Sequence, residues 1–207
     1  MSIEITIRDY HPKDALEVVK VFRDSNNTLR KSKGGKHPDD VMDKMMKMSD
    51  RRIITWITQG RVLLVAEVKE TGEIAGIGTI DKVWRNRLLN STCSANHYVK
   101  EKFQRGRAGV SVGSMLRRET INKAKSLGFR KMFGYSNPEA VGFHKRFGAK
   151  FFPAYNIKAY KNTVELNYYE FELYASIWNS IRIEPNIFKM IMLWNDIRRS
   201  LRCKLRI

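Results

Sequence analysis

The chain has few cysteines, few histidines and no long apolar run, and each shortage excludes a class of protein. Its 207 residues include two cysteines, Cys93 and Cys203, which are too few for a disulfide framework. The cysteines and the four scattered histidines lack the spacing of metal ligands, so we expect no metal. The longest uninterrupted apolar run, Val62–Ala66, is far below the roughly 18 residues of a membrane span.

The first residues alternate in polarity and form no basic start followed by an apolar block. A secretory signal is therefore not predicted, and we expect a cytoplasmic location.

Acidic residues are scarce, with 21 against 39 basic residues and a formal net charge of +18. The hydrophobic share of 43% and the charged share of 29% are still typical of a globular protein. A surface this basic attracts polyanions and phosphorylated or carboxylated small molecules, and it repels cationic substrates. The alternative is a solvated basic surface with no ligand of its own.

The hydrophobic pattern predicts strands and helices in a mixed order. We expect strands at 3–8, 53–57, 61–68, 74–80, 92–99, 129–135 and 164–173, the last as one strand or a pair. Helices are expected at 12–22, 38–48, 112–127 and 138–147, with Gly128 and Gly148 ending the last two. The turn-rich segment 26–36 is predicted to be a loop. This order predicts an α/β protein with a mixed sheet.

A loop rich in glycine and arginine, residues 104–109, leads to the helix predicted at 112–127. Small residues let a phosphate approach the backbone, and unpaired N–H groups at the positive end of a helix dipole bind anions. Arg105 and Arg107 add positive charge. The loop has neither the Gly-Lys-Ser/Thr of a Walker A motif nor the acidic residue of a dinucleotide fold. An ordinary turn is the alternative interpretation.

This loop, followed by Val112-Gly113-Ser114-Met115-Leu116, resembles the acyl-CoA loop and helix of the GNAT N-acetyltransferases. The segment 137–149 resembles the second signature of that superfamily, a short helix that begins at Asn and is closed by Gly and an apolar residue. The resemblance covers about residues 1–173 and implies a largely antiparallel central sheet with a splayed parallel pair, flanked by helices. Residues 174–207 are expected to form a C-terminal helical extension outside the acyltransferase domain.

The resemblance implies acetyl-CoA as cosubstrate and an amine acceptor that attacks it directly in a ternary complex. The loop is about two residues longer than usual, so the register of its phosphate contacts stays open. The implied cofactor contacts are Val99, Gln104, Arg105, Gly106, Arg107, Ala108, Gly109, Val110, Ser111, Gly113 and Asn137.

Four residues are candidates for proton transfer. His144 occupies a position where the family commonly has tyrosine, and an unperturbed imidazole can donate a proton near neutrality. His97 is the first candidate for the base that takes the proton of the amine, and Glu101 and Glu67 follow it. The alternatives are that His144 only packs or faces solvent and that His97 is a half-buried core histidine.

The acceptor and the partners stay open. The net charge favours an acidic amine or one that is part of a protein. The extension 174–207 packs on its own domain by default, and a substrate cover, a homodimer seam and contact with an anionic surface are its other candidate roles. The alternative function is that of a non-catalytic GNAT-like module that binds nucleic acid through its basic surface, although the sequence has no recognised nucleic-acid-binding motif.

Overall fold

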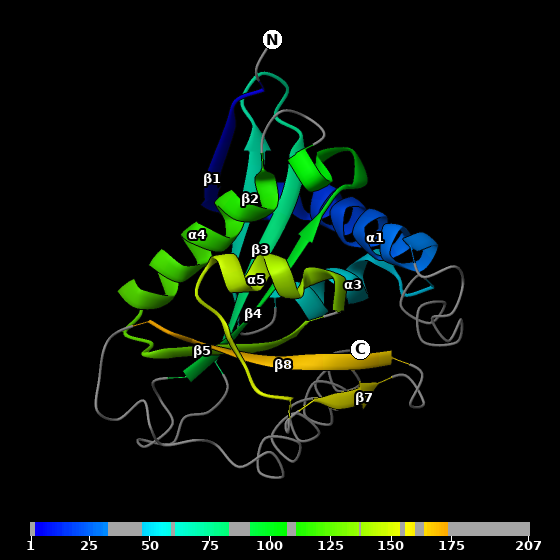
Figure 1. Ribbon diagram of the computed structural model, residues 1–207. Helices are drawn as coiled ribbons and strands as arrows, with labels where there is room; N and C mark the ends of the chain where they lie inside the picture. Colours follow the sequence, from blue (N-terminus) through cyan, green and yellow to red (C-terminus); the bar gives the residue numbers. More distant parts are fainter. Residues whose placement is uncertain are drawn as a thin grey trace, which may run out of the picture.

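The computed structural model describes residues 3–32, 47–58, 61–82, 92–106, 111–136, 138–153, 156–159 and 164–173. One sheet runs through them in the order β1-β2-β3-β4-β5-β8-β6, and β7 pairs with β8 beside this path (Figure 1). The strands are β1 (Ile5–Asp9), β2 (Arg61–Val68), β3 (Ile74–Lys82), β4 (Thr92–Val99), β5 (Lys131–Ser136), β6 (Lys150–Phe151), β7 (Ile157–Ala159) and β8 (Val164–Glu172).

Only β4 and β5 pair in parallel, and every other neighbouring pair of these strands is antiparallel. The predicted mixed, largely antiparallel sheet is therefore confirmed. Strands β5 and β8 run at a clear angle to β2, β3 and β4 (Figure 1).

Helices cover both faces of this sheet. The helical elements are η1 (Pro12–Asp14), α1 (Ala15–Ser32), α3 (Asp50–Thr58), η2 (Glu101–Gly106), α4 (Val112–Ser126), η3 (Pro138–Ala140) and α5 (Val141–Arg146). Adjacent residues of β4 show the two layers, because successive side chains of a strand point to opposite faces. Tyr98 packs on Phe22 of α1, whereas His97 lies against Thr120 of α4. None of the described helices is long and apolar enough to cross a membrane.

The continuous apolar run in β2 is explained by these two layers. Leu63 and Val65 join the core under α1 and α3, and Leu64 and Ala66 join the core under α4. A strand that is buried on both faces has no polar face to alternate with, so its sequence reads as an uninterrupted apolar stretch.

The strand predicted at 53–57 is wrong, because these residues form α3. Ile53 and Ile57 are both fully buried and lie one helical turn apart, on the side that packs against α1 and β2. The β-branched side chains favoured a strand locally, but the four-residue spacing of the buried positions decides the element.

The loop predicted from residue 26 is also wrong for its first part, because α1 continues to Ser32. Asn26 donates its side-chain amide to the Phe22 carbonyl at 2.7 Å, and the Thr28 hydroxyl donates to the Asp24 carbonyl at 3.0 Å. These turn-forming residues are satisfied within the helix, where their side chains bond back to the preceding turn. The helix predicted at 38–48 lies mostly outside the described residues.

Glycines end two elements as predicted. Gly128 follows α4 with φ +80°, and Gly148 follows α5 with φ +87°, both in the left-handed region that favours glycine. Residues 174–207, the expected extension, lie outside the described residues.

Candidate active site

The parallel strands β4 and β5 separate shortly after they meet. Their pairing covers only three residue pairs and ends at Ser94 and Phe133. Beyond this point β4 continues to Val99 along β3, while β5 continues to Ser136 along β8. In the described structure, β5 does not pair with β4 beyond Ser94, so a wedge opens between the two strands.

The segment that follows β4 is held against the end of this strand. Gln104 lies in η2 and donates its side-chain amide to the Val99 carbonyl at 2.7 Å. Phe103 of the same turn is buried in the core under α4. The predicted contacts Val99 and Gln104 are thus brought together, and Arg105 and Gly106 end η2 directly after them.

Helix α4 begins at this end of β4 without a side-chain cap. Ser111 occupies the N-cap position, but its hydroxyl donates to the Ser114 hydroxyl at 2.7 Å rather than accepting from a backbone N–H. The first turn of α4 holds no acidic residue. A Cβ on Gly113 would lie 3.9 Å from both Val99 and Phe143, so this glycine sits where β4, α4 and α5 meet.

Five of the predicted cofactor contacts, Arg107, Ala108, Gly109, Val110 and Asn137, lie outside the described residues.

His144 is buried on the α4 face of the sheet. It is 9% exposed, and its ring stacks on Tyr169 of β8 with 4.3 Å between the ring centres. Its Nδ1 lies 2.9 Å from the guanidinium of Arg117. Burial and then the charge of Arg117 lower the pKa of His144 from 6.5 to about 3. The imidazole is therefore neutral near pH 7, and this environment does not favour an imidazolium that would act as a proton donor.

Arg117 was not among the predicted site residues, yet it lies at the centre of this cluster. Its side chain is fully buried in α4 and contacts the Tyr169 hydroxyl at 3.2 Å and the Met132 sulfur at 3.5 Å. The guanidinium also lies over the Phe171 ring, 4.3 Å from the ring centre. A signal was present in the sequence, because Arg117 adjoins the buried stripe Val112, Leu116, Thr120 and Ala124 of α4.

His97 belongs to the same face of the sheet. It lies on the part of β4 that β5 has left, and its Nε2 is 3.0 Å from the Thr120 hydroxyl. Burial, the charge of Arg117 and the proximity of His144 hold the pKa of His97 well below 6.5. The charge of one buried arginine, Arg117, thus acts on both His97 and His144.

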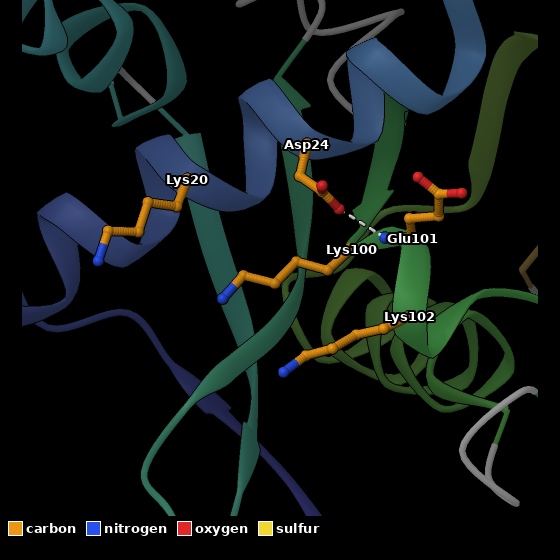
Figure 2. Close-up of a pocket in the computed structure, with 5 residues that line it drawn as sticks. All are labelled: Lys20, Asp24, Lys100, Glu101 and Lys102. Atoms are coloured by element: carbon orange, nitrogen blue, oxygen red, sulfur yellow. Dashed lines mark hydrogen bonds between the residues drawn. The ribbon is translucent and has the colours of Figure 1, made fainter. Parts of the chain in front are cut away.

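Glu101, the second candidate base, lies on the opposite face, towards α1. Its backbone N–H donates to the Asp24 carboxylate at 2.5 Å, and its own carboxylate lies 3.3 Å from the Thr28 hydroxyl. Figure 2 shows Asp24 pointing from α1 towards the start of η2. Together these residues line an open hollow of about 510 Å³ whose other lining residues are Lys20, Lys100 and Lys102.

The lysines of this hollow are paired with carboxylates outside it. Lys100 contacts Glu17 at 3.0 Å and Glu73 at 2.9 Å, and Lys102 contacts Glu73 at 2.7 Å. The hydrogen bond from Lys20, together with Lys100, lowers the pKa of Glu17 against the opposing effect of burial. The cations around the hollow are therefore held in place by neighbouring carboxylates.

Within the described residues, no group of three or more His, Cys, Asp or Glu side chains is arranged to hold a metal ion.

No protein family model matches the chain in sequence, and no curated protein matches it. Solved structures do match in fold. A GCN5-related N-acetyltransferase from Kribbella flavida aligns at 16% identity with a TM-score of 0.62, over 81% of this chain and 97% of its own. An acetyltransferase of the GNAT family from Streptococcus pneumoniae aligns at 17% identity with a TM-score of 0.58, over 82% of this chain and 99% of its own.

A third structure is described as a candidate acetyltransferase from Salmonella typhimurium with its cofactor acetyl-CoA. It aligns at 13% identity with a TM-score of 0.62, over 84% of this chain and 96% of its own. These likenesses show that the protein has the fold of the GNAT N-acetyltransferases.

Proposed function

We propose that this protein, which has the GNAT fold, transfers the acetyl group of acetyl-CoA to an amine. The observation that carries the proposal is the separation of β4 from β5 after three residue pairs, next to the uncapped start of α4. The wedge offers a strand edge to an extended chain, and the helix start offers N–H groups to an anion. Acetyl-CoA contains both features, an amide-rich arm and a diphosphate.

The pantetheine arm would lie along β4 between Ala95 and Val99. An extended chain with amide groups can pair with a strand edge in the way a further strand does. A backbone N–H of β4 would then donate to the thioester carbonyl and stabilise the negative charge that develops on its oxygen during attack.

The diphosphate would lie at the start of α4. Ser111 and Gly113 are at this helix end, and the absence of an acidic residue from its first turn leaves the positive end of the helix dipole uncompensated by the helix itself. Arg105, Gly106, Arg107, Ala108, Gly109 and Val110 form the chain between Gln104 and Ser111 and would complete this contact. Asn137 would contact the cofactor from the end of β5.

The acceptor would approach from the α1 side, where the hollow at Asp24 and Glu101 lies (Figure 2). Glu101 suits the role of base better than His97, because Glu101 is one of the residues that line this hollow. His97 is a weak base with a pKa well below 6.5, and its Nε2 already contacts Thr120.

Direct attack by the amine is favoured over acetylation of Cys93, the cysteine within the described residues. Cys93 is fully buried at the paired part of β4 and β5, and burial followed by the charge of Asp81 raises the pKa of its thiol to about 12. A thiol in this environment is a poor nucleophile at neutral pH.

Isothermal titration with acetyl-CoA tests the proposed function. We expect saturable micromolar binding to the wild-type chain, and we expect Arg107→Glu to remove it because the diphosphate would meet a carboxylate. Arg130→Glu makes the same charge change at the exposed residue before β5, and it should retain binding. A wild-type chain that does not bind acetyl-CoA would refute the proposed function.

A further inference from the structure

Arg117 is a buried cation whose charge is not compensated by the described chain. Its side chain is fully buried, and it forms no ion pair with a carboxylate of the described residues. Its Nε has no hydrogen-bond partner there. Burying a cation without an anion is costly, so a negative charge supplied by a ligand would be stabilised beside Arg117.

The same contact sets the proton position on His144. A guanidinium has only donors, so Nδ1 of His144 accepts from Arg117 and the ring proton of the neutral imidazole is on Nε2. Although His144 is 9% exposed, Nε2 makes no hydrogen bond within the described part of the chain. Nε2 is not among the buried unpartnered atoms of the described chain, so this donor can reach an acceptor that a ligand brings.

The groups around His144 present no described carboxylate to it. Arg117 faces it from α4 and Tyr169 stacks on it from β8, while His97 of β4 interacts with it electrostatically. Its neighbours Lys145 and Arg146 on α5 are exposed and positive. The pair thus combines a directed N–H donor, a fixed positive charge and a largely aromatic lining.

We propose that Arg117 is a positioning residue for acetyl transfer, which holds His144 with its Nε2–H directed at the sulfur of CoA and stabilises that sulfur as it leaves as a thiolate. The inference rests on the proposed function, because the sulfur must reach the wedge beside these residues. A departing thiolate supplies both features that Arg117 and His144 lack, a hydrogen-bond acceptor and a negative charge.

The transfer step balances without protonation of His144. The amine nitrogen forms a bond to the carbonyl carbon, the C–S bond breaks, and its electron pair goes to sulfur. The proton of the attacking amine goes to the base or to water. The imidazole remains neutral and only donates a hydrogen bond, and the thiolate takes its proton from water after release.

The acidity of CoA bound to the protein tests this inference without knowledge of the acceptor. The thiol of free CoA and of bound CoA is titrated by the ultraviolet difference absorbance of its thiolate. An opposite charge and a hydrogen bond to the charged form both favour ionisation, so we expect the pKa of the bound thiol to lie about one pH unit or more below that of free CoA.

Three variants separate charge from shape. Arg117→Met removes the charge while keeping a long side chain, and we expect the pKa of the bound thiol to return to that of free CoA. Arg117→Lys keeps the charge, so the pKa of the bound thiol should stay mostly lowered. His144→Phe removes the hydrogen-bond donor, so the lowered pKa of the bound thiol should be lost. Arg118→Met makes the same change as the first variant at the next, exposed residue of α4 and serves as the control.

Each outcome decides the inference. Bound CoA whose thiol ionises as in free solution, or a lowering that survives in Arg117→Met, overturns the role of Arg117 and leaves the proposed function standing. A wild-type chain that does not bind CoA overturns both. Loss of the lowering in Arg117→Met and His144→Phe, with retention in Arg117→Lys and Arg118→Met, establishes the inference.

Discussion

His144 and Arg117 define each other's chemistry at the scale of single residues. Position 144 could be found from the sequence, since the resemblance to the GNAT signature points to it. The neutral state of His144 could not be found from the sequence, because this state depends on a buried arginine 27 positions earlier and on a tyrosine of the last described strand. Arg117 itself resembles the other basic residues of α4 in sequence, and only the packing of α4 on the sheet distinguishes it.

The neutral state of His144 predicts a specific loss of stability in acid. The unfolded chain binds a proton at this side chain near pH 6.5, whereas the folded chain binds it only near pH 3. The contribution of neutral His144 to the free energy of unfolding is therefore fully present above pH 6.5. It is lost as the pH falls towards 3, by up to about 1.4 kcal/mol per pH unit. We expect His144→Phe to make the free energy of unfolding less sensitive to acid in this interval.

Urea unfolding followed by circular dichroism at several pH values between 4 and 8 measures this effect. Above pH 7 the two proteins should respond to pH in the same way, which provides the internal reference. Identical slopes for both proteins between pH 6.5 and 4 would contradict the assignment of a neutral, buried His144.

At the scale of elements, the close approach of α4 to the sheet shapes the site. Gly76 of β3 makes this approach possible, since a Cβ there would lie 2.9 Å from Leu116, 3.2 Å from Val112 and 3.0 Å from the Tyr98 carbonyl. The Tyr98 oxygen belongs to the backbone of β4, so it cannot move away as a side chain would.

We expect Gly76→Ala to lower the free energy of unfolding by about 1–3 kcal/mol, because the added methyl group overpacks the contact between α4 and β3. Gly142→Ala is the matched control on α5, where a Cβ would have no atom within 4 Å. This control should be neutral or stabilising by about 0.5–1 kcal/mol, as expected when alanine replaces glycine within a helix. Equal stabilities of the two variants in urea unfolding would show that α4 does not pack as tightly as described.

The elements also show where sequence patterns succeed and fail. The strands β2, β3 and β4 and the helices α4 and α5 follow from periodicity and from Gly128 and Gly148, because these signals are local. Helix α3 contradicts the strand that local pattern predicts, since burial against α1 overrides the strand preference of the β-branched Ile53 and Ile57. The short strands β6 and β7 have only two and three residues, and their pairing with β8 is not a local property.

At the scale of the whole molecule, the net charge of +18 acts on every anionic ligand. Acetyl-CoA carries phosphates, so the field of the protein should accelerate its association. We expect the association rate constant to fall as the ionic strength rises from about 0.05 M to about 0.5 M, with a much smaller change in dissociation, because salt screens long-range attraction more than close contacts. Stopped-flow fluorescence of the four tryptophans measures both rates, and an association rate that does not depend on salt would contradict electrostatic steering.

The wedge is also a property of the whole sheet. The sequence predicted a parallel pair only through its resemblance to the GNAT signatures, since periodicity does not reveal where two strands separate. The separation follows from the different partners of the two strands, with β3 continuing along β4 and β8 continuing along β5. The hollow at Asp24 and Glu101 is formed by residues 77 positions apart, and no sequence pattern around either residue predicts that they meet.

A crystal structure of the protein with saturating acetyl-CoA is the most direct test of this account. We predict that the pantetheine arm lies along β4 between Ala95 and Val99, with the diphosphate at the start of α4 and the sulfur within hydrogen-bond reach of Nε2 of His144. Acetyl-CoA bound elsewhere on the protein, with the wedge between β4 and β5 filled by side chains, would contradict it.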